Sequence, residues 1–171
     1  NDQHVLSSYK GSQGNIYLTT QENYLYELDA DEHIQRSTLL PSTSTCIVYE
    51  AGKLFIGTKK GLYIYNSNKV SQVLSTADFH CKSLVANNGK VYFNDDKNVF
   101  CYDAIQNKLS DLHFPINTYI GSLGIDKHTQ TLWVLSQDGA HTLQLSDTAH
   151  FAALNSINSV CNGIYCDMEN N

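Results

Sequence analysis

An internal repeat constrains the fold more than any other feature of this 171-residue chain. An apolar triplet with a central aromatic residue begins at residues 16, 54, 91 and 132, so the repeat is about 40 residues long. The four triplets are Ile16-Tyr17-Leu18, Leu54-Phe55-Ile56, Val91-Tyr92-Phe93 and Leu132-Trp133-Val134. A second strand-like run follows each triplet after a short polar turn, at Leu25–Leu28, Leu62–Tyr65, Val99–Tyr102 and Ala140–Leu143. Helical periodicity is missing, which predicts an all-β fold.

Further strand candidates complete the repeats. One kind precedes the triplet, at Thr45–Tyr49, Lys82–Ala86 and Ser122–Asp126, and another follows the second run, at Val70–Leu74, Leu109–His113 and Phe151–Leu154. Four short strands in about 40 residues are typical of one β-propeller blade. We therefore predict a single partial β-propeller domain over residues 1–171. Its blades are expected at about 4–40, 41–80, 81–121 and 122–158, with the start of a fifth at 159–171.

The repeated aromatic residues are expected to pack between blades rather than to bind a ligand. Tyr17, Phe55, Tyr92 and Trp133 occupy the same place in the repeat, where a large side chain fills the layer between neighbouring sheets. Gly61 and Gly139 fall in the turns between the second and third strands, where hairpins require a positive φ.

Composition and charge exclude several classes of partner. Eleven basic and 17 acidic side chains give a net charge of -6, which attracts neither a phosphate backbone nor an anionic membrane. No run of residues reaches the ~20 apolar residues that cross a bilayer. The five cysteines lack the spacing of zinc ligands. Cys161 and Cys166 could form a local disulfide in an oxidising compartment or remain two buried free thiols.

The second repeat resembles the two-component regulator propeller repeat. The resemblance is carried by residues 52–66, GKLFIGTKKGLYIYN, with a glycine turn, a strand with a central aromatic, Gly-Thr, a polar turn, Gly-Leu and a closing Tyr-Asn. The third repeat matches more loosely through Asn88–Phe93 and Phe100–Asp103. The resemblance implies the periplasmic sensor of a hybrid two-component protein, anchored in the inner membrane. Such sensors respond to glycan breakdown products and signal to a cytoplasmic histidine kinase, whose motifs this chain does not carry.

One end of the predicted blades is the expected ligand-binding face. In a propeller, the turns between the second and third strands and the connections between blades line one face around the channel. Charged residues beside an aromatic ring suit an oligosaccharide, through hydrogen bonds and ring stacking. For any single one of them, a solvated turn residue is the favoured interpretation. The candidates are Glu22, Asn23, Lys59, Lys60, His80, Asp95, Asp96, Tyr119 and Asp138.

Catalysis, metals and cofactors are not predicted. His80 is the one histidine expected near the channel, which is thin support for a lyase or hydrolase. Asp29, Asp31 and Glu32 share a turn but lack the glycine and the final glutamate of a calcium loop. The alternatives to a sensor are a stand-alone protein-interaction scaffold and, less favoured, a propeller enzyme.

Blade number bears on the expected partners. Four repeats are fewer than the usual six to eight blades, and an open arc leaves an apolar face and a strand edge uncovered at each end. Three arrangements are open: a fragment of a larger propeller, a closed ring of four blades, or a homodimer through the open edges. We favour the fragment, whose partners are the remainder of the parent propeller and an oligosaccharide.

Overall fold

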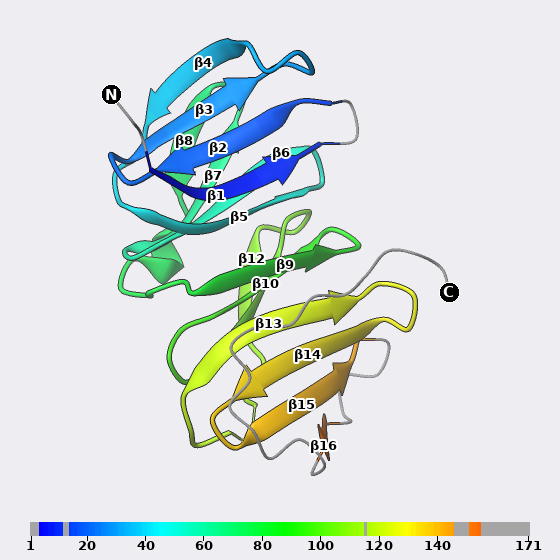
Figure 1. Ribbon diagram of the computed structural model, residues 1–171. Helices are drawn as coiled ribbons and strands as arrows, with labels where there is room; N and C mark the ends of the chain where they lie inside the picture. Colours follow the sequence, from blue (N-terminus) through cyan, green and yellow to red (C-terminus); the bar gives the residue numbers. More distant parts are fainter. Residues whose placement is uncertain (1–3, 12–13, 115, 146–150, 155–171) are drawn as a thin grey trace. The chain divides into compact units, whose positions relative to one another are not determined.

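The chain forms four antiparallel sheets of four strands each in a computed structural model (Figure 1). The structure describes residues 4–11, 14–114, 116–145 and 151–154. Each sheet is built from four strands that are consecutive in sequence, and none of the sheets in this part of the chain closes on itself. Each sheet contains one of the four repeated apolar triplets, and the described residues form an all-β fold consistent with propeller-like blades. The predicted fifth repeat, with Cys161 and Cys166, lies outside the described residues.

Two compact units divide the chain, residues 1–84 and 85–171. The first unit contains two complete sheets. The first sheet consists of β1 (Val5–Lys10), β2 (Ile16–Thr20), β3 (Tyr24–Leu28) and β4 (Ile34–Leu39). The second consists of β5 (Ser44–Glu50), β6 (Lys53–Thr58), β7 (Gly61–Asn66) and β8 (Lys69–Gln72), followed by the 3-10 helix η1 (Leu74–Thr76).

The second unit contains the other two sheets, except that its first strand begins just before the boundary. The third sheet consists of β9 (Ser83–Asn87), β10 (Lys90–Asn94), β11 (Val99–Asp103) and β12 (Lys108–Asp111). The fourth consists of β13 (Ile120–Asp126), β14 (Thr131–Ser136), β15 (Gly139–Gln144) and β16 (Phe151–Leu154).

The strands that the sequence predicts all form, with small differences at their ends, and β1 and β4 are added to the first sheet. β8 stops at Gln72 rather than Leu74, because the chain turns there into η1. β12 stops at Asp111 rather than His113, whose φ of 48° is incompatible with a strand. Gly61 and Gly139 have φ values of 109° and 133°, which confirms the positive φ expected in those two hairpins.

Each unit has its own apolar core between its two sheets. In the first unit, Tyr17 faces this layer together with Leu25 of β3 and Leu54 and Ile56 of β6. In the second unit, Tyr92 faces Leu132 and Val134 of β14. The predicted packing role is confirmed for Tyr17, Phe55 and Tyr92, which are at most 8% exposed. Trp133 is half-buried, because it points away from the layer that its neighbours Leu132 and Val134 fill.

Candidate ligand-binding site

Backbone hydrogen bonds gather the candidate residues of the first unit at one end of its two sheets. Glu22 and Asn23 form the β2–β3 turn, and Lys59 and Lys60 form the β6–β7 turn. The connection between the two sheets, residues 40–43, joins these turns, because the Leu40 N–H donates to the Asn23 carbonyl and the Lys59 N–H donates to the Thr43 carbonyl. The structure therefore places both turns at the same end of the unit, where Glu22, Lys59 and Lys60 are exposed.

His80 lies at this end too, in the loop before β9. Its neighbour Cys81 donates its backbone N–H to the Thr58 carbonyl, at a distance of 3.0 Å, beside the β6–β7 turn. The Thr45 hydroxyl donates to the Cys81 carbonyl. The imidazole of His80 is exposed. No group of three or more possible metal ligands in the described residues includes it.

Asn23 has a conformation that explains its residue type. Its φ of 65° lies in the left-handed region, which asparagine tolerates better than most residues. Its Oδ1 atom is buried and accepts no hydrogen bond from the residues that the structure describes. Asn23 therefore serves as a turn residue. Its Oδ1 atom can still accept a hydrogen bond from a group other than the described residues.

The second unit repeats the arrangement of the first. Asp95 and Asp96 form the β10–β11 turn, and Asp138 lies in the β14–β15 turn. The connection between the two sheets again joins the turns, because the Ile120 N–H donates to the Asp96 carbonyl and the Gln137 N–H donates to the Tyr119 carbonyl. Tyr119 is 43% exposed beside them. These four candidate residues therefore share one end of their unit.

Asp95 has a structural task in its turn. Its Oδ1 atom accepts hydrogen bonds from the backbone N–H groups of Lys97 and Asn98, at 2.8 and 2.7 Å. The Asn98 side-chain amide adds a contact with each carboxylate oxygen at 3.3 Å. This is an Asx-type turn, in which the carboxylate replaces a backbone acceptor.

Asp138 collects three side-chain donors. Its Oδ1 atom accepts from the hydroxyls of Ser136 and Thr118, the latter at 3.0 Å, and lies 3.1 Å from Nε2 of His141. These hydrogen bonds, the one from Ser136 first, lower the pKa of Asp138 to about 2. The same Nε2 atom is 3.1 Å from the Ser136 hydroxyl. One imidazole nitrogen thus meets both partners, so this serine, histidine and aspartate are not arranged as a nucleophile, base and orienting acid.

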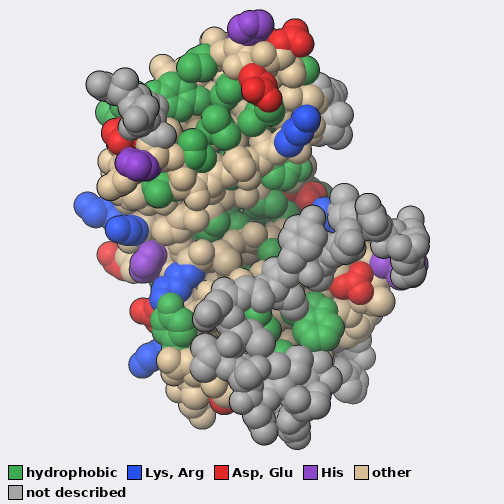
Figure 2. Space-filling model, in the orientation of Figure 1, with side chains coloured by type: hydrophobic (Ala, Val, Ile, Leu, Met, Phe, Trp, Pro, Cys, Tyr) green, Lys and Arg blue, Asp and Glu red, His purple; other side chains and the backbone are tan. Residues whose placement is uncertain are grey.

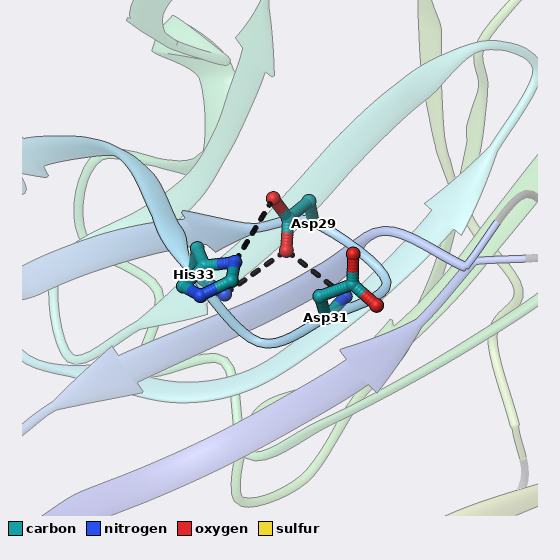
Figure 3. A group of neighbouring side chains, drawn as sticks. All are labelled: Asp29, Asp31 and His33. Atoms are coloured by element: carbon teal, nitrogen blue, oxygen red, sulfur yellow. Dashed lines mark hydrogen bonds and ion pairs between the residues drawn. The ribbon is translucent and has the colours of Figure 1, made fainter.

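Asp29, Asp31 and His33 bring three possible metal ligands together in the β3–β4 turn (Figure 3). One ligand atom from each lies within 4.8 Å of the others. The oxygens of Asp29 are engaged, because they accept from the backbone N–H groups of Asp31 and His33 and from the Gln35 amide, at 3.0, 2.9 and 2.7 Å. The His33 N–H is the largest cause of the lowered pKa of Asp29. The cluster is a hydrogen-bonded turn, and the His33 side chain is 77% exposed.

A pocket that the sequence analysis did not identify lies at the other end of the first unit. It has a volume of about 210 Å³. It opens by the β5–β6 and β7–β8 hairpins, which are at the opposite ends of their strands from the β6–β7 turn. It is lined by Tyr17, Glu27, Tyr49, Gly52, Leu54, Tyr65, Asn66, Ser67 and Asn68.

Glu27 is held in this pocket by tyrosine hydroxyls. The Tyr65 hydroxyl donates to Glu27 Oε2 at 3.2 Å, and the Tyr17 hydroxyl donates to Oε1 at 3.5 Å. Burial, followed by the charge of Glu27, raises the pKa of both phenols, so both remain protonated donors. The rings of Tyr17 and Tyr49 stack, with centroids 6.2 Å apart.

A signal for this pocket is present in the sequence. Glu27 is the charged residue in the apolar run Leu25–Leu28, and strand alternation places it on the same face as Leu25, which faces the core. In the β2–β3 pairing, Glu27 is also opposite Tyr17. A carboxylate on the core side of a strand needs polar partners, and that requirement predicts the cluster of phenols around it.

Comparison with solved structures identifies the fold. Two crystal structures from B. thetaiotaomicron match 97% of the chain, with TM-scores of 0.76 and 0.74 at 18% and 20% sequence identity. They are described as the extracellular domain of BT4673, named a one-component system in one and a hybrid two-component system in the other. A nidogen/laminin complex matches 91% of the chain and 66% of the matched protein, with a TM-score of 0.72 at 10% identity.

These likenesses show the fold alone. The chain spans about a quarter of the length of the BT4673 domain, 25% in both structures. In all, 968 chains of solved structures match, so the fold is widely shared. No protein-family model matches the sequence, and no curated protein matches it.

Proposed function

We propose that this chain is a ligand-sensing part of the periplasmic region of a hybrid two-component signalling protein. The observation that carries the proposal is the match of 97% of the chain to the extracellular domain of BT4673. The local resemblance of residues 52–66 to the two-component regulator propeller repeat points the same way independently. The parent protein is then membrane-anchored and carries its histidine kinase outside this chain. No helix of the described residues is long and apolar enough to span a membrane.

The task of the chain in this proposal is binding, without catalysis. His80 is exposed, and in the second unit one nitrogen of His141 meets both Ser136 and Asp138, which suits a braced turn better than proton transfer. Both features favour the sensor over a propeller lyase or hydrolase. The kinase reaction belongs to the parent protein.

An oligosaccharide is the proposed ligand, and the turn ends of the units are its proposed contacts. In the first unit, Glu22, Lys59 and Lys60 are exposed at the same end as Asn23, whose Oδ1 atom is buried and has no donor among the described residues. In the second unit, the exposed Tyr119 shares its end of the unit with Asp96 and Asp138. Ring stacking combined with charged and amide hydrogen-bonding groups suits a sugar.

Binding of the purified 171-residue chain to an array of oligosaccharides tests this proposal, with calorimetry on each hit. We expect saturable binding of a complex-glycan fragment, which weakens when Lys59 and Lys60 are both replaced by alanine. Lys69→Ala is the matched control, because Lys69 is an exposed lysine of the same sheet on β8. Absence of binding to every oligosaccharide, or equal loss in the control, would contradict a glycan-binding role for these turns.

A protein-interaction scaffold is the second candidate, and an exposed apolar surface favours it. Ile34 and Leu39 of the edge strand β4 are 63% and 64% exposed. Figure 2 shows hydrophobic side chains gathered over the sheet that ends in β4. Such a surface suits another protein or a second copy of the chain. A stable complex with another protein that forms without glycan would favour the scaffold over the sensor.

A further inference from the structure

We propose that the tyrosine-lined pocket of the first unit binds an organic ammonium group, with Glu27 as its counter-ion. The site is at the opposite end of the unit from the turns proposed to contact glycan. It uses a different ligand chemistry. The proposal therefore goes beyond the proposed function, and neither depends on the other.

The charge of the pocket selects a cation. Glu27 is the one charged side chain among the nine described residues that line it, and the other eight are neutral. Arg36 is opposite Glu27 in the β3–β4 pairing, and its charge opposes the rise in the pKa of Tyr65, but the residue is exposed and does not line the pocket. An anionic ligand would therefore meet the Glu27 carboxylate with no cation of the lining to offset the repulsion.

The position of Glu27 is fixed before any ligand arrives. Hydroxyls of Tyr17 and Tyr65, from β2 and β7, lie 3.5 and 3.2 Å from one carboxylate oxygen each, and the Tyr65 hydroxyl is also 3.4 Å from Oδ1 of Asn68. Each carboxylate oxygen has a second lone pair, which remains to face a positive group. Since the two phenols come from different sheets, the carboxylate does not need to reorganise on binding, which reduces the entropic cost.

The aromatic lining suits an alkylated ammonium better than a metal ion. Ring faces of tyrosine attract cations, and cages of such rings recognise quaternary ammonium groups. Tyr17, Tyr49 and Tyr65 line the pocket together with the one carboxylate, and the rings of Tyr17 and Tyr49 stack on each other. Calcium sites are built mainly from carboxylate and carbonyl oxygens, and the side chains of this lining offer one carboxylate and two amides.

The size of the pocket fits the same class of ligand. A volume of about 210 Å³ equals the volume that roughly seven water molecules occupy in liquid water. A bare ammonium ion would leave most of this space unfilled, whereas a trimethylammonium group with a short tail brings methyl groups against the rings. Asn66, Ser67 and Asn68 at the exposed rim can then hydrogen-bond a polar tail.

Two probes of the same shape test the charge requirement on the unchanged protein. Choline chloride is titrated into the 171-residue chain and compared with 3,3-dimethyl-1-butanol, in which an uncharged carbon replaces the nitrogen. Binding is followed by calorimetry and by NMR of the tyrosine rings. We expect saturable choline binding at least about tenfold tighter than that of the alcohol. Equal affinities, or no binding of choline, would overturn the proposal.

Variants then locate the site. Glu27→Gln keeps the size and one of the two oxygens that accept from the tyrosine hydroxyls but removes the charge. It is expected to weaken choline binding about tenfold. Asp78→Asn removes a carboxylate charge from an exposed position after η1 in the same unit and is expected to leave choline binding unchanged. Tyr49→Leu removes a stacked ring and should also weaken binding. Equal effects of Asp78→Asn and Glu27→Gln would overturn the assignment to this pocket.

Discussion

Asp138 is the carboxylate with the lowest pKa that the structure assigns, about 2. The folded protein stabilises the ionised carboxylate of Asp138, because the side chains of Ser136, Thr118 and His141 all contact the same carboxylate oxygen. An unperturbed aspartate titrates near 3.9. The folded state therefore gains stability from Asp138 above about pH 4 and loses it as the pH falls from about 4 toward 2.

Replacing Asp138 by asparagine should make the acid limb of the stability curve shallower. We expect Asp138→Asn to lower the free energy of unfolding at pH 7 by less than about 1 kcal/mol, because water screens this half-exposed group. The difference from wild type should shrink between pH 4 and pH 2. Denaturant unfolding at a series of pH values measures it, with the exposed Asp78→Asn as control. A difference that stays constant over this pH range would refute the argument.

At the scale of elements, the short helix η1 packs against the β6–β7 hairpin and hydrogen-bonds to it. The Thr76 hydroxyl of η1 accepts from the Leu62 N–H at 2.8 Å and donates to the Val73 carbonyl at 2.7 Å. Gly61 fits against this helix. A Cβ atom at Gly61 would lie 2.5 Å from the Thr76 carbonyl oxygen and 3.0 Å from its hydroxyl. The hairpin therefore requires glycine both for its φ of 109° and for space.

Two glycine substitutions separate these requirements. Gly52→Ala adds a methyl group at a φ of 76° with nothing within 4 Å, so we expect a loss of about 1 kcal/mol from backbone strain alone. Gly61→Ala adds the backbone clash and should cost roughly 2–4 kcal/mol. Chemical denaturation of both variants gives the difference. Equal losses would show that the contact with Thr76 is unimportant.

The edge strand β4 is the element through which we expect copies of the chain to associate. Its Ile34 and Leu39 expose apolar surface beside unpaired strand groups, and charged residues on an edge oppose strand-to-strand pairing. We expect Ile34→Lys to reduce concentration-dependent self-association in sedimentation velocity while leaving the thermal midpoint nearly unchanged. Leu74→Lys is the control, because Leu74 is 81% exposed but lies in η1. If only the control variant reduced association, β4 would not be the contact.

At the scale of the whole molecule, charge governs solubility and partner choice. The net charge is -6, and the calculated pI is about 5.5. We expect self-association to be strongest near pH 5.5 and double-stranded DNA to remain unbound at physiological salt. Light scattering across pH and an electrophoretic mobility assay measure the two effects. A DNA complex stable at 0.15 M salt would contradict the argument from charge.

The repeat pattern is sufficient to predict an all-β fold of four sheets, because strand periodicity recurs in every repeat and glycine turns support it in the second and fourth. The apolar triplets all lie in the second strands, at β2, β6, β10 and β14. Gly61 and Gly139 mark turns that only a positive φ can close. The end of β12 was not predictable in the same way, because the positive φ of His113 follows from its N–H bonding the Asp111 carboxylate, which is a local contact.

The pocket was not predicted, because its residues are far apart in the sequence and come together only in the folded unit. Its residues come from two sheets, and Glu27 meets Tyr65 across 38 positions in the sequence. Tyr17 was assigned to packing, which is correct for its ring, but its hydroxyl also reaches Glu27. The turn residues were easier to find, since each blade repeats them. Whether they bind glycan remains a prediction.

Sequencing the gene on both sides of the segment that encodes this chain tests the central claim most directly. A sensor of the proposed kind predicts a signal peptide upstream, more blade repeats, and then a membrane-spanning segment followed by a histidine-kinase module downstream. A stop codon soon after Asn171, with no further repeats upstream, would contradict the sensor and leave a small propeller-like protein whose partners define its role.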